Sequence, residues 1–554
     1  MRAKPEGKVW LINIIIALSA AVLFIPFLGN VHLFDWDEIN FAESAREMIE
    51  SRDYLTVRIN YIPFWEKPPL FIWMQVLSMK IFGINEFAAR FPNALCGILS
   101  LLVLFNIGRK QFDNRFGLIW VLLYAGSLLP FFYFKSGIID PWFNLFIFLG
   151  IYQFYRYVNQ PDRALQYATG AALFIGLAIL TKGPVALLVF LITTGIFLLV
   201  KKFKAQIRLS HVLTFIMVLT FTGGFWFILQ ILKGNFSVIA DFILYQIRLF
   251  RTEDAGHGGF LFYHFIVLFA GVFPASVFAL PVLFGSGEEP GPKKDFYLWM
   301  LILFWTVLIL FTLVRTKIVH YSSLCYFPLT FLATWSFIHA RSVSGLWGIL
   351  TKGLIITLGS ILALTVIVLT YIDRYKDMLI DRGWIVDPFA KGCLMADAEW
   401  KGYEFIAGLI LLIGLSGFTI FWRKKHFDHA LITLTGTLPV FMIVSMILIV
   451  PRVEAYSQRA AVDFFQSLSD RDVYLETVGY KSYVHLFYGR VKNTAPRDGR
   501  DEKWLLTGPI DKDAYFSIKV TRMERFMKEY PDAELLYEKN GFVFFKRTSK
   551  TLPD

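Results

Sequence analysis

Apolar runs of bilayer length recur along most of this 554-residue chain, and short charged loops separate them. An α-helix needs roughly 17–25 predominantly apolar residues to cross the hydrocarbon core of a membrane. The sequence therefore predicts a polytopic α-helical membrane protein with about 13 transmembrane helices. The predicted spans lie near residues 10–29, 90–108, 116–134, 139–157, 166–181, 184–200, 210–232, 260–284, 297–314, 319–338, 349–371, 403–422 and 429–450.

The composition excludes a soluble globular protein. Hydrophobic residues make up 56% of the chain and aromatic residues 17%, and the mean hydropathy is +0.54, which is characteristic of membrane proteins. The net charge of +12 does not indicate a nucleic-acid partner, because the bases fall in short loops, where they set membrane topology. The three cysteines have neither metal-binding nor redox spacing, so no disulfide framework is expected.

Lys and Arg in the short loops predict the orientation of the spans. Under the predicted count these bases collect on one side together with the basic N-terminus, and the positive-inside bias makes that side the cytoplasm. They are Arg2, Lys4, Lys8, Arg109, Lys110, Arg115, Lys201, Lys202, Lys204, Arg208, Lys293, Lys294, Arg423, Lys424 and Lys425. The loops of residues 31–89 and 233–259 and the C-terminal region are therefore expected outside.

Two segments of these outer loops are expected to lie on the membrane rather than cross it. Residues 69–82 and 236–250 are apolar on one face and too short to span. They either pack at the interface or roof a cavity where a lipid-borne substrate meets the first loop. Beyond them, residues 452–554 have the composition of a soluble domain, with strand-like stretches at 473–477, 483–487 and 542–546 and a helical stretch near 520–529. A small external α/β domain is expected there.

The stretch from Asp35 to Pro69 concentrates acids and bases directly after the first apolar run, and uncompensated charge next to hydrocarbon is costly. We interpret it as an active site at the membrane surface. Asp37 and Glu38 follow Trp36, so partial desolvation would raise the pKa of a carboxylate there and suit it to proton abstraction. The alternative role is a helix N-cap, because an amphipathic helix is predicted directly afterwards. The two roles are compatible.

Lys67 stands next to two prolines in a stiff extended turn and is suited to hold an anion such as a phosphate. The alternative is a lysine that snorkels to the interface. Other external cations are expected to converge on the same anion and to stabilise a leaving group: Arg58, Arg248, Arg251, Arg315 and Lys317. Asp140 is either a helix cap or a second carboxylate of the site, and Lys182 is expected to snorkel or to act as a counter-charge.

His257 lies between glycines in an external loop, and flanking glycines allow a close approach to a ligand. Glu66 and His257 are candidates to share a divalent metal ion, although two ligands without a third form a weak pattern. An exposed loop histidine is the alternative.

These motifs resemble a known family. Asp37-Glu38 is followed by Ala42-Glu43-Ser44-Ala45-Arg46-Glu47-Met48 and then by Asn60-Tyr61-Ile62-Pro63-Phe64-Trp65-Glu66-Lys67-Pro68-Pro69-Leu70. The combination is similar to the polyprenyl-phosphate-sugar-dependent glycosyltransferases of the GT-C superfamily, specifically the bacterial aminoarabinose transferases of lipid A and, more distantly, the protein O-mannosyltransferases. Supporting motifs are Leu180-Thr181-Lys182-Gly183-Pro184-Val185 and Thr316-Lys317-Ile318-Val319-His320-Tyr321.

The resemblance implies a GT-C fold of about thirteen spans in the bacterial inner (plasma) membrane, with the site facing the periplasm. Residues 1–451 would form the catalytic domain and residues 452–554 a periplasmic domain. The expected activity is inverting transfer of a sugar from an undecaprenyl-phosphate donor to an acceptor on the periplasmic side, most simply a lipid A-like glycolipid. No cofactor is expected to be required beyond the candidate metal ion. Membrane lipids, but no nucleic acid, are the expected surroundings.

The resemblance also implies roles for individual residues. Asp37, with Glu38, would be the catalytic carboxylate pair, and Lys67 would bind the donor phosphate. Lys317 and Tyr321 would line the phosphate site, and Glu66 with His257 would form the ion-binding pair. Further residues expected at the site are Arg58, Arg248, Asp140, Asn60 and Tyr61.

Departures from the family pattern leave the sugar and the acceptor open. Ile39-Asn40 stands where the aminoarabinose transferases usually have an Arg, and Thr316-Lys317-Ile318-Val319 replaces Ser-Lys-Leu-Pro. A protein O-glycosyltransferase with the same donor therefore remains an alternative. A transporter or flippase for a lipid-linked sugar is a second one, disfavoured because the ionisable residues concentrate in loops and no internal repeat is evident.

Overall fold

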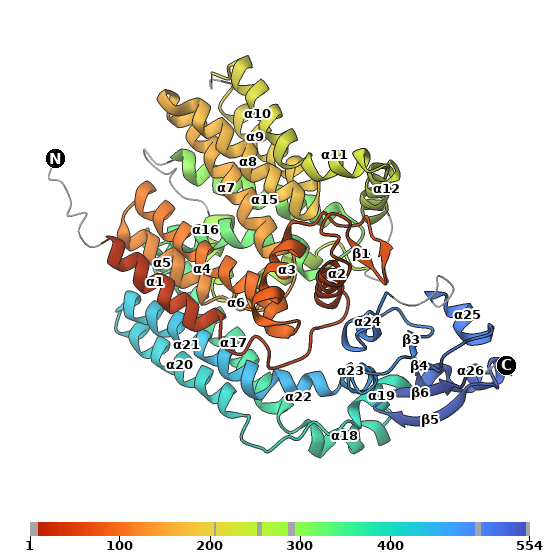
Figure 1. Cartoon of the computed structure of the whole chain (residues 1–554). Helices are drawn as coiled ribbons and strands as arrows, with labels where there is room; N and C mark the ends of the chain where they lie inside the picture. The colour runs from red at the N-terminus through yellow and green to blue at the C-terminus, as the bar shows by residue number, and fades with distance from the viewer. Residues whose placement is uncertain (1–8, 204–205, 252–257, 286–293, 494–499, 550–554) are drawn as a thin grey trace.

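The computed structural model describes residues 9–203, 206–251, 258–285, 294–493 and 500–549. Helices fill most of the molecule, and a small sheet near the C-terminus lies at one side of the helical bundle (Figure 1). Residues that link the first helix to α3 lie between these two parts and contact both. We call the end of the bundle where these residues lie, next to the C-terminal sheet, the site end.

Six helical segments within the described residues are long and apolar enough to cross a membrane: Glu86–Gln111 (α4), Pro161–Lys182 (containing α8), Asp295–Leu313 (within α15), Gly345–Leu369 (α17), Ile406–Arg423 (α20) and Phe427–Ala455 (containing α21 and α22). A seventh span is possible if α10 (Leu209–Thr222) and α11 (Phe225–Leu232), bent by 55°, are counted together. Shorter apolar helices are α1 (Val9–Phe24), α3 (Leu70–Phe82), α9 (Val185–Val200) and α14 (Ala275–Phe284). The polytopic helical architecture is confirmed.

Several predicted spans are broken in the structure, which contributes to the smaller number of full-length helices found in the described residues than the sequence predicts. The predicted span 116–134 divides into α5 (Asn114–Ala125) and α6 (Leu128–Tyr133) at a glycine. The span 260–284 divides into α13 (Tyr263–Gly271) and α14 next to Pro274. The span 319–338 begins with the 3₁₀ turn η4 (Val319–Cys325) and becomes α-helical only in α16 (Tyr326–Ile338). Gly and Pro interrupt helices where neighbouring segments can satisfy the backbone.

The outer face of the bundle is apolar. On α17, for example, Leu346 and Ile349 are 70% and 71% exposed, although both are large apolar side chains. Inside the bundle, Trp120 and Trp299 are fully buried. A buried core under an exposed apolar surface is the arrangement expected when the surroundings are lipid.

The helix α2 (Asp37–Ser51) is buried almost throughout, although its sequence is rich in charge. It packs against α3 and against α24 (Val484–Tyr488) of the C-terminal part. Arg46 pairs with Glu43 and with Glu50, each at 2.6 Å, so these charges compensate one another, as buried charges must. The first loop is therefore a packed structural unit.

The C-terminal part contains a four-stranded sheet in the order β3-β4-β6-β5, in which β3 is parallel to β4 and the other pairs are antiparallel. The strands are β3 (Tyr474–Thr477), β4 (Ala514–Lys519), β5 (Glu534–Lys539) and β6 (Phe542–Arg547). The helices are α23 (Arg459–Gln466), α24, α25 (Glu502–Thr507) and α26 (Met523–Glu529). The predicted strands at 473–477 and 542–546 and the helix near 520–529 are confirmed.

The predicted strand at 483–487 is wrong, because this short apolar stretch is the helix α24. Short apolar runs do not distinguish buried strand from buried helix. Here the stretch is helical and packs as α24 on α2 and α23.

Glu476 on β3 provides a test of stability in this domain. Burial and, to a lesser degree, the Glu502 carboxylate raise the pKa of Glu476 from 4.5 to about 7. The folded state thus binds more protons than the unfolded state between these values, so the free energy of unfolding falls as the pH rises from 4.5 to about 7. Glu476→Gln is expected to remove this fall and to stabilise β3 at pH ~8 by up to about 3 kcal/mol.

The measurement is hydrogen exchange of β3 in the full chain in detergent, corrected for intrinsic exchange, at pH ~5 and ~8. Glu524→Gln, on the exposed side of α26, is the matched control and is expected to change nothing. Equal pH dependence in wild type and Glu476→Gln would contradict the assignment.

Candidate functional site

A cavity of about 610 Å³ opens at the site end, where α2, the segment before α3, α7 (Asp140–Asn159), α9, α12 (Ser237–Arg251) and η4 meet. Its polar lining residues carry both signs of charge: Asp35, Asp37, Glu38, Glu66, Lys67, Asp140, Lys182, Arg248, His320 and Lys481. Its apolar lining residues, which we call the apolar wall, include Phe143, Val185, Leu188, Val189, Phe311 and Leu324. The cavity can thus receive a molecule with a charged head and a hydrocarbon chain.

Asp37 is the first residue of α2 and lines this cavity. Its side chain is 39% exposed, and its Oδ2 lies 3.4 Å from Nε2 of His320. The N-terminal end of a helix favours a negative charge. Trp36, the preceding residue, has φ +76°, a conformation that non-glycine residues rarely adopt. Its ring packs edge-on against Tyr483 and beneath the ammonium of Lys481. The Asp37 carboxylate is therefore held at the N-terminus of α2 and remains accessible from the cavity.

Glu38 is buried and is engaged on both oxygens. Nε and Nη2 of Arg90 donate to its carboxylate at 2.9 and 2.8 Å, and the backbone N–H groups of Phe34 and Gly137 donate as well. Burial raises the pKa of Glu38, but Arg90 and these N–H groups outweigh it and bring the pKa below its usual value. Glu38 thus anchors the loop, and Asp37 is the more exposed carboxylate of the pair, with 39% of its side chain exposed against 5% for Glu38.

Asp140, Lys182 and His320 form a second polar group in the cavity. Nζ of Lys182 lies 2.6 Å from Oδ1 of Asp140 and 5.2 Å from the centre of the Tyr321 ring. Oδ2 of Asp140 lies 3.8 Å from Nε2 of His320. Asp140 is therefore both the first residue of α7 and a carboxylate of the site. Lys182 therefore acts as the counter-charge of Asp140 within the cavity, which is the second of its two predicted roles.

Lys67 lines the same cavity. Its Nζ donates to the hydroxyl of Tyr245 at 3.1 Å and lies 4.6 Å from the centre of that ring. The guanidinium of Arg248 lies 5.1 Å from the same ring and 3.8 Å from Glu66. The segment 236–250, predicted to roof a cavity, therefore supplies part of it as α12. Two cations next to the same tyrosine make this part of the cavity suited to an anion.

Five described residues that were predicted at the site do not line the cavity: Arg58, Asn60, Tyr61, Arg315 and Lys317. Arg58 pairs with Asp53 at 2.9 Å. Lys317 donates to the carbonyl groups at the end of α15, including those of Thr312 and Val314 at 2.6 Å, so its ammonium neutralises a helix C-terminus. Neither cation belongs to the lining of the cavity that contains Asp37 and Lys67.

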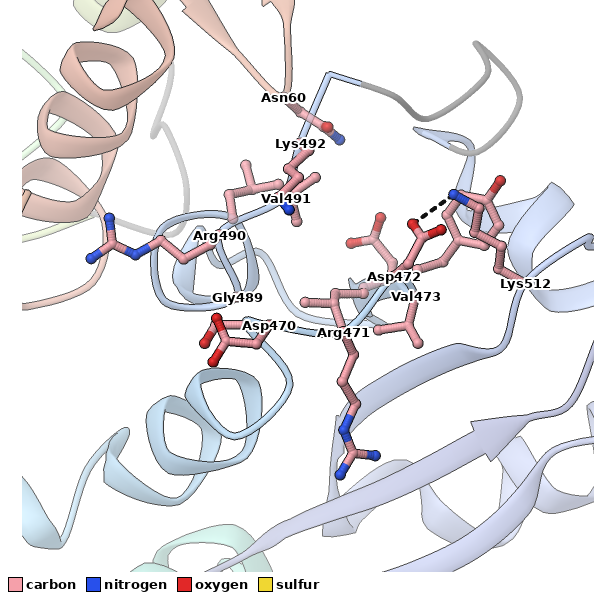
Figure 2. Close-up of a pocket in the computed structure, with 15 residues that line it drawn as sticks. Asn60, Asp470, Arg471, Asp472, Val473, Gly489, Arg490, Val491, Lys492 and Lys512 are labelled. Atoms are coloured by element: carbon pink, nitrogen blue, oxygen red, sulfur yellow. Dashed lines mark hydrogen bonds and ion pairs between the residues drawn. The ribbon is translucent and has the colours of Figure 1, made fainter. Parts of the chain in front are cut away.

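Asn60 and Tyr61 form the two-residue turn between β1 (Arg58–Ile59) and β2 (Ile62–Pro63), with φ of +53° and +59°, as in a hairpin turn. The Tyr61 hydroxyl donates to Glu50 and to the carbonyl of Val491. Figure 2 shows Asn60 at the edge of a second pocket, of about 440 Å³, whose other labelled residues come from the C-terminal part. These two residues stabilise the contact between loop and domain.

The structure describes only one of the two residues predicted to share a metal ion, so this prediction stays untested. Glu66 lies 3.8 Å from the cation Arg248, and His257 lies outside the described residues. Among the residues that the structure describes, no group of three or more His, Cys, Asp or Glu side chains could hold a metal ion. We derive no step through a metal.

Sequence reasoning missed His320, Lys182, Lys481 and Tyr483 as site residues. His320 and Lys182 lie in the two supporting motifs described above, so the sequence did contain a signal for them. Lys481 and Tyr483 come from the C-terminal part, and no local pattern connects them with a loop more than 400 residues earlier.

The family model described as dolichyl-phosphate-mannose-protein mannosyltransferase matches residues 66–226. An uncharacterized protein from Aquifex aeolicus is 25% identical over 334 residues, covering 60% of this chain and 64% of the relative. The undecaprenyl phosphate-alpha-4-amino-4-deoxy-L-arabinose arabinosyl transferase from Pectobacterium carotovorum is 25% identical over 371 residues, covering 65% of each chain. The chain thus spans slightly less than two thirds of the length of these two relatives.

The solved structure of ArnT from Cupriavidus metallidurans bound to undecaprenyl phosphate superimposes on the whole chain. The TM-score is 0.74 at 19% sequence identity, covering 99% of this chain and 100% of that chain. The apo structure of the same protein gives a TM-score of 0.72. This chain therefore has the fold of that protein, a polytopic helical membrane bundle with a small C-terminal sheet domain.

Proposed function

We propose that this chain, which resembles the polyprenyl-phosphate-sugar-dependent glycosyltransferases in sequence and in fold, moves a sugar from an undecaprenyl-phosphate donor to a glycolipid acceptor of the lipid A type. One observation carries the proposal: Asp37 and Lys67 line the same cavity, which also has an apolar wall. A catalytic carboxylate, a phosphate-binding cation and space for a hydrocarbon chain are what this reaction requires. The name of the matched transferase and the lipid bound to the solved relative agree with it.

The donor would lie with its phosphate between Lys67 and Arg248 and its prenyl chain along the apolar wall near Leu188. The acceptor oxygen attacks the anomeric carbon while the bond from that carbon to the phosphate oxygen breaks. Charge grows on the departing lipid phosphate, and the cations stabilise it in the transition state. Attack from the side opposite the leaving group inverts the anomeric centre.

Asp37 would act on the attacking side, either taking the proton of a hydroxyl acceptor or orienting a phosphate acceptor. Glu38, held by Arg90, fixes the first turn of α2 and thereby the position of Asp37. No resident cofactor takes part in this scheme. The reaction draws its driving force from the phosphate leaving group of the donor.

The proposed setting is the bacterial inner membrane. The N-terminus would be cytoplasmic, residues 1–451 would carry the site on the periplasmic side, and residues 452–554 would form a periplasmic domain. Reporter fusions at the two ends that are active only in the periplasm test this orientation: activity is expected at the C-terminal end alone.

A protein acceptor is the second candidate. The mannosyltransferase family model, whose description names a protein as the acceptor, matches residues 66–226, and this segment includes Glu66, Lys67, Asp140 and Lys182. A product found on envelope proteins instead of glycolipids would favour this candidate. Movement of the donor lipid across the membrane without any new glycan would favour a flippase.

Lys67→Ala provides the first functional test. A charge-assisted hydrogen bond contributes about 1.5–3 kcal/mol, so the KM for an undecaprenyl-phosphate sugar is expected to rise about 10- to 100-fold. The measurement is release of undecaprenyl phosphate from the donor by the purified protein at varied donor concentration. Lys80→Ala, which removes a lysine of α3 that lies over Tyr54 outside the cavity, is the control. An unchanged donor KM in Lys67→Ala would remove Lys67 from the donor site.

A further inference from the structure

The proposed function assigns no role to His320, a titratable group that lines the cavity. His320 lies on η4, before the helix α16 begins, and its side chain is only 14% exposed. Its Nε2 faces two carboxylates, with Oδ2 of Asp37 at 3.4 Å and Oδ2 of Asp140 at 3.8 Å. A histidine between a candidate general base and a second carboxylate is an arrangement suited to proton transfer.

We propose that the acceptor group is a hydroxyl and that its proton passes through Asp37 to His320. This inference rests on the proposed function and assigns the chemical class of the acceptor at the same site. A phosphate monoester is already anionic at neutral pH, so it can attack without losing a proton. A hydroxyl needs a base, and the proton that the base takes must then leave it before the next turnover.

The surroundings of Asp140 support a transient positive charge on His320. Oδ1 of Asp140 is occupied by Lys182 at 2.6 Å. Its Oδ2 is buried and has no hydrogen-bond partner within the described part of the chain, and this is the oxygen that faces Nε2 of His320. An imidazolium formed there would be flanked by Asp37 and Asp140, and an opposite charge within ~4–6 Å favours the charged form.

The proton balance is complete without any further reactant. The acceptor O–H bond breaks and its oxygen forms the bond to the anomeric carbon. The bond from that carbon to the phosphate oxygen breaks, and the electron pair leaves with the lipid phosphate. The proton goes to the Asp37 carboxylate, then to Nε2 of His320, and is released to water after the products leave.

Charged groups of both signs surround His320: Asp140 and Asp37 favour its protonated form, whereas Lys182 and Lys67 disfavour it. His264 on α13 also interacts with His320, and Lys317 lies three residues before it. A neutral imidazole in this position can accept the proton from Asp37. Turnover on a hydroxyl acceptor is expected to fall as the pH drops through the pKa of His320.

The first experiment compares two acceptors with the purified full chain and an undecaprenyl-phosphate sugar. One is a lipid A-type glycolipid that carries phosphate, and the other is the same glycolipid after complete dephosphorylation. Transfer to the dephosphorylated glycolipid is expected, with the sugar on a hydroxyl by fragmentation mass spectrometry. A sugar attached only to phosphate would overturn the inference and leave the proposed function intact. Donor cleavage without transfer to either glycolipid would overturn both.

The second experiment tests His320 itself. His320→Ala is expected to lower kcat about 10²-fold with an unchanged KM for the donor, to lose the acidic limb of the pH profile, and to regain activity with added imidazole. A merely structural role would not produce rescue that depends on the pKa of the added imidazole.

A second variant, His320→Asn, is included in case His320→Ala folds poorly. Binding of undecaprenyl phosphate is measured for both variants as a test of correct folding. Both variants are expected to bind this lipid as the wild type does. Retention of the acidic limb in either variant, or failure of imidazole to restore a variant that binds the lipid, would contradict the relay.

Discussion

Asp37→Asn is expected to lower kcat for sugar transfer about 10²- to 10⁴-fold, the contribution typical of a positioned general base, while the protein folds and binds undecaprenyl phosphate normally. The side chain is 39% exposed at the first turn of α2, so the amide fits without a new buried charge. The amide cannot take a proton. Turnover with saturating donor and acceptor is the measurement.

Asp53→Asn is the matched control for this variant. Asp53 belongs to the same loop but pairs with Arg58 outside the cavity. Its pKa is lowered to about 2 despite partial burial, chiefly through the backbone N–H of Leu55 and contacts with Thr56. It is therefore a structural carboxylate. Near-normal turnover in Asp37→Asn, or an equal loss in Asp53→Asn, would remove Asp37 from the chemistry.

Arg90→Ala is expected to be the most destabilising single change at the site end. Arg90 donates to Glu38 and to the carbonyl groups of Leu28, Val31 and His32, so it connects α4 to the segment that leads into α2. Its removal leaves the buried Glu38 carboxylate without a counter-charge, and breaking a buried pair in this way costs about 3–5 kcal/mol. Loss of activity should follow from loss of structure around Asp37.

The measurement is thermal unfolding of the purified chain in detergent, with hydrogen exchange to locate the loosened segment. Arg115→Ala provides the comparison, because Arg115 and Asp428 form an exposed pair, and exposed pairs contribute about 0–1 kcal/mol. The double variant Arg90→Met with Glu38→Met is expected to recover part of the lost stability. If Arg90→Ala unfolds no earlier than Arg115→Ala, the anchoring role of the Glu38 pair is wrong.

The architecture could be anticipated from hydrophobicity because a helix in lipid must present apolar residues over a whole span. Asp37, Lys67, Asp140, Tyr321, Glu66 and Arg248 were predicted as site residues and do line one cavity. Their positions next to helix ends and prolines carry local signals. The number of full-length helices was harder to predict from the sequence, because a glycine or proline break is tolerated only where neighbouring helices satisfy the backbone.

Three basic residues show what the sequence pattern does not predict. Arg58, Lys182 and Lys317 are all basic residues of the predicted outer side, but their partners decide their roles. Asp140, 42 residues before Lys182, draws that ammonium into the cavity, whereas the end of α15 holds Lys317 away from it. Such choices depend on distances between elements, and the sequence pattern does not contain them.

The most direct test of sugar transfer by this cavity is mass spectrometry of envelope glycolipids and proteins from cells with the wild-type chain, without the chain, and with Asp37→Asn. Lipid-linked transfer predicts a glycolipid carrying one additional sugar that is present with the wild type, absent without the chain, and absent with Asp37→Asn. A glycolipid profile that does not change on deletion, or that Asp37→Asn restores fully, would contradict sugar transfer through Asp37.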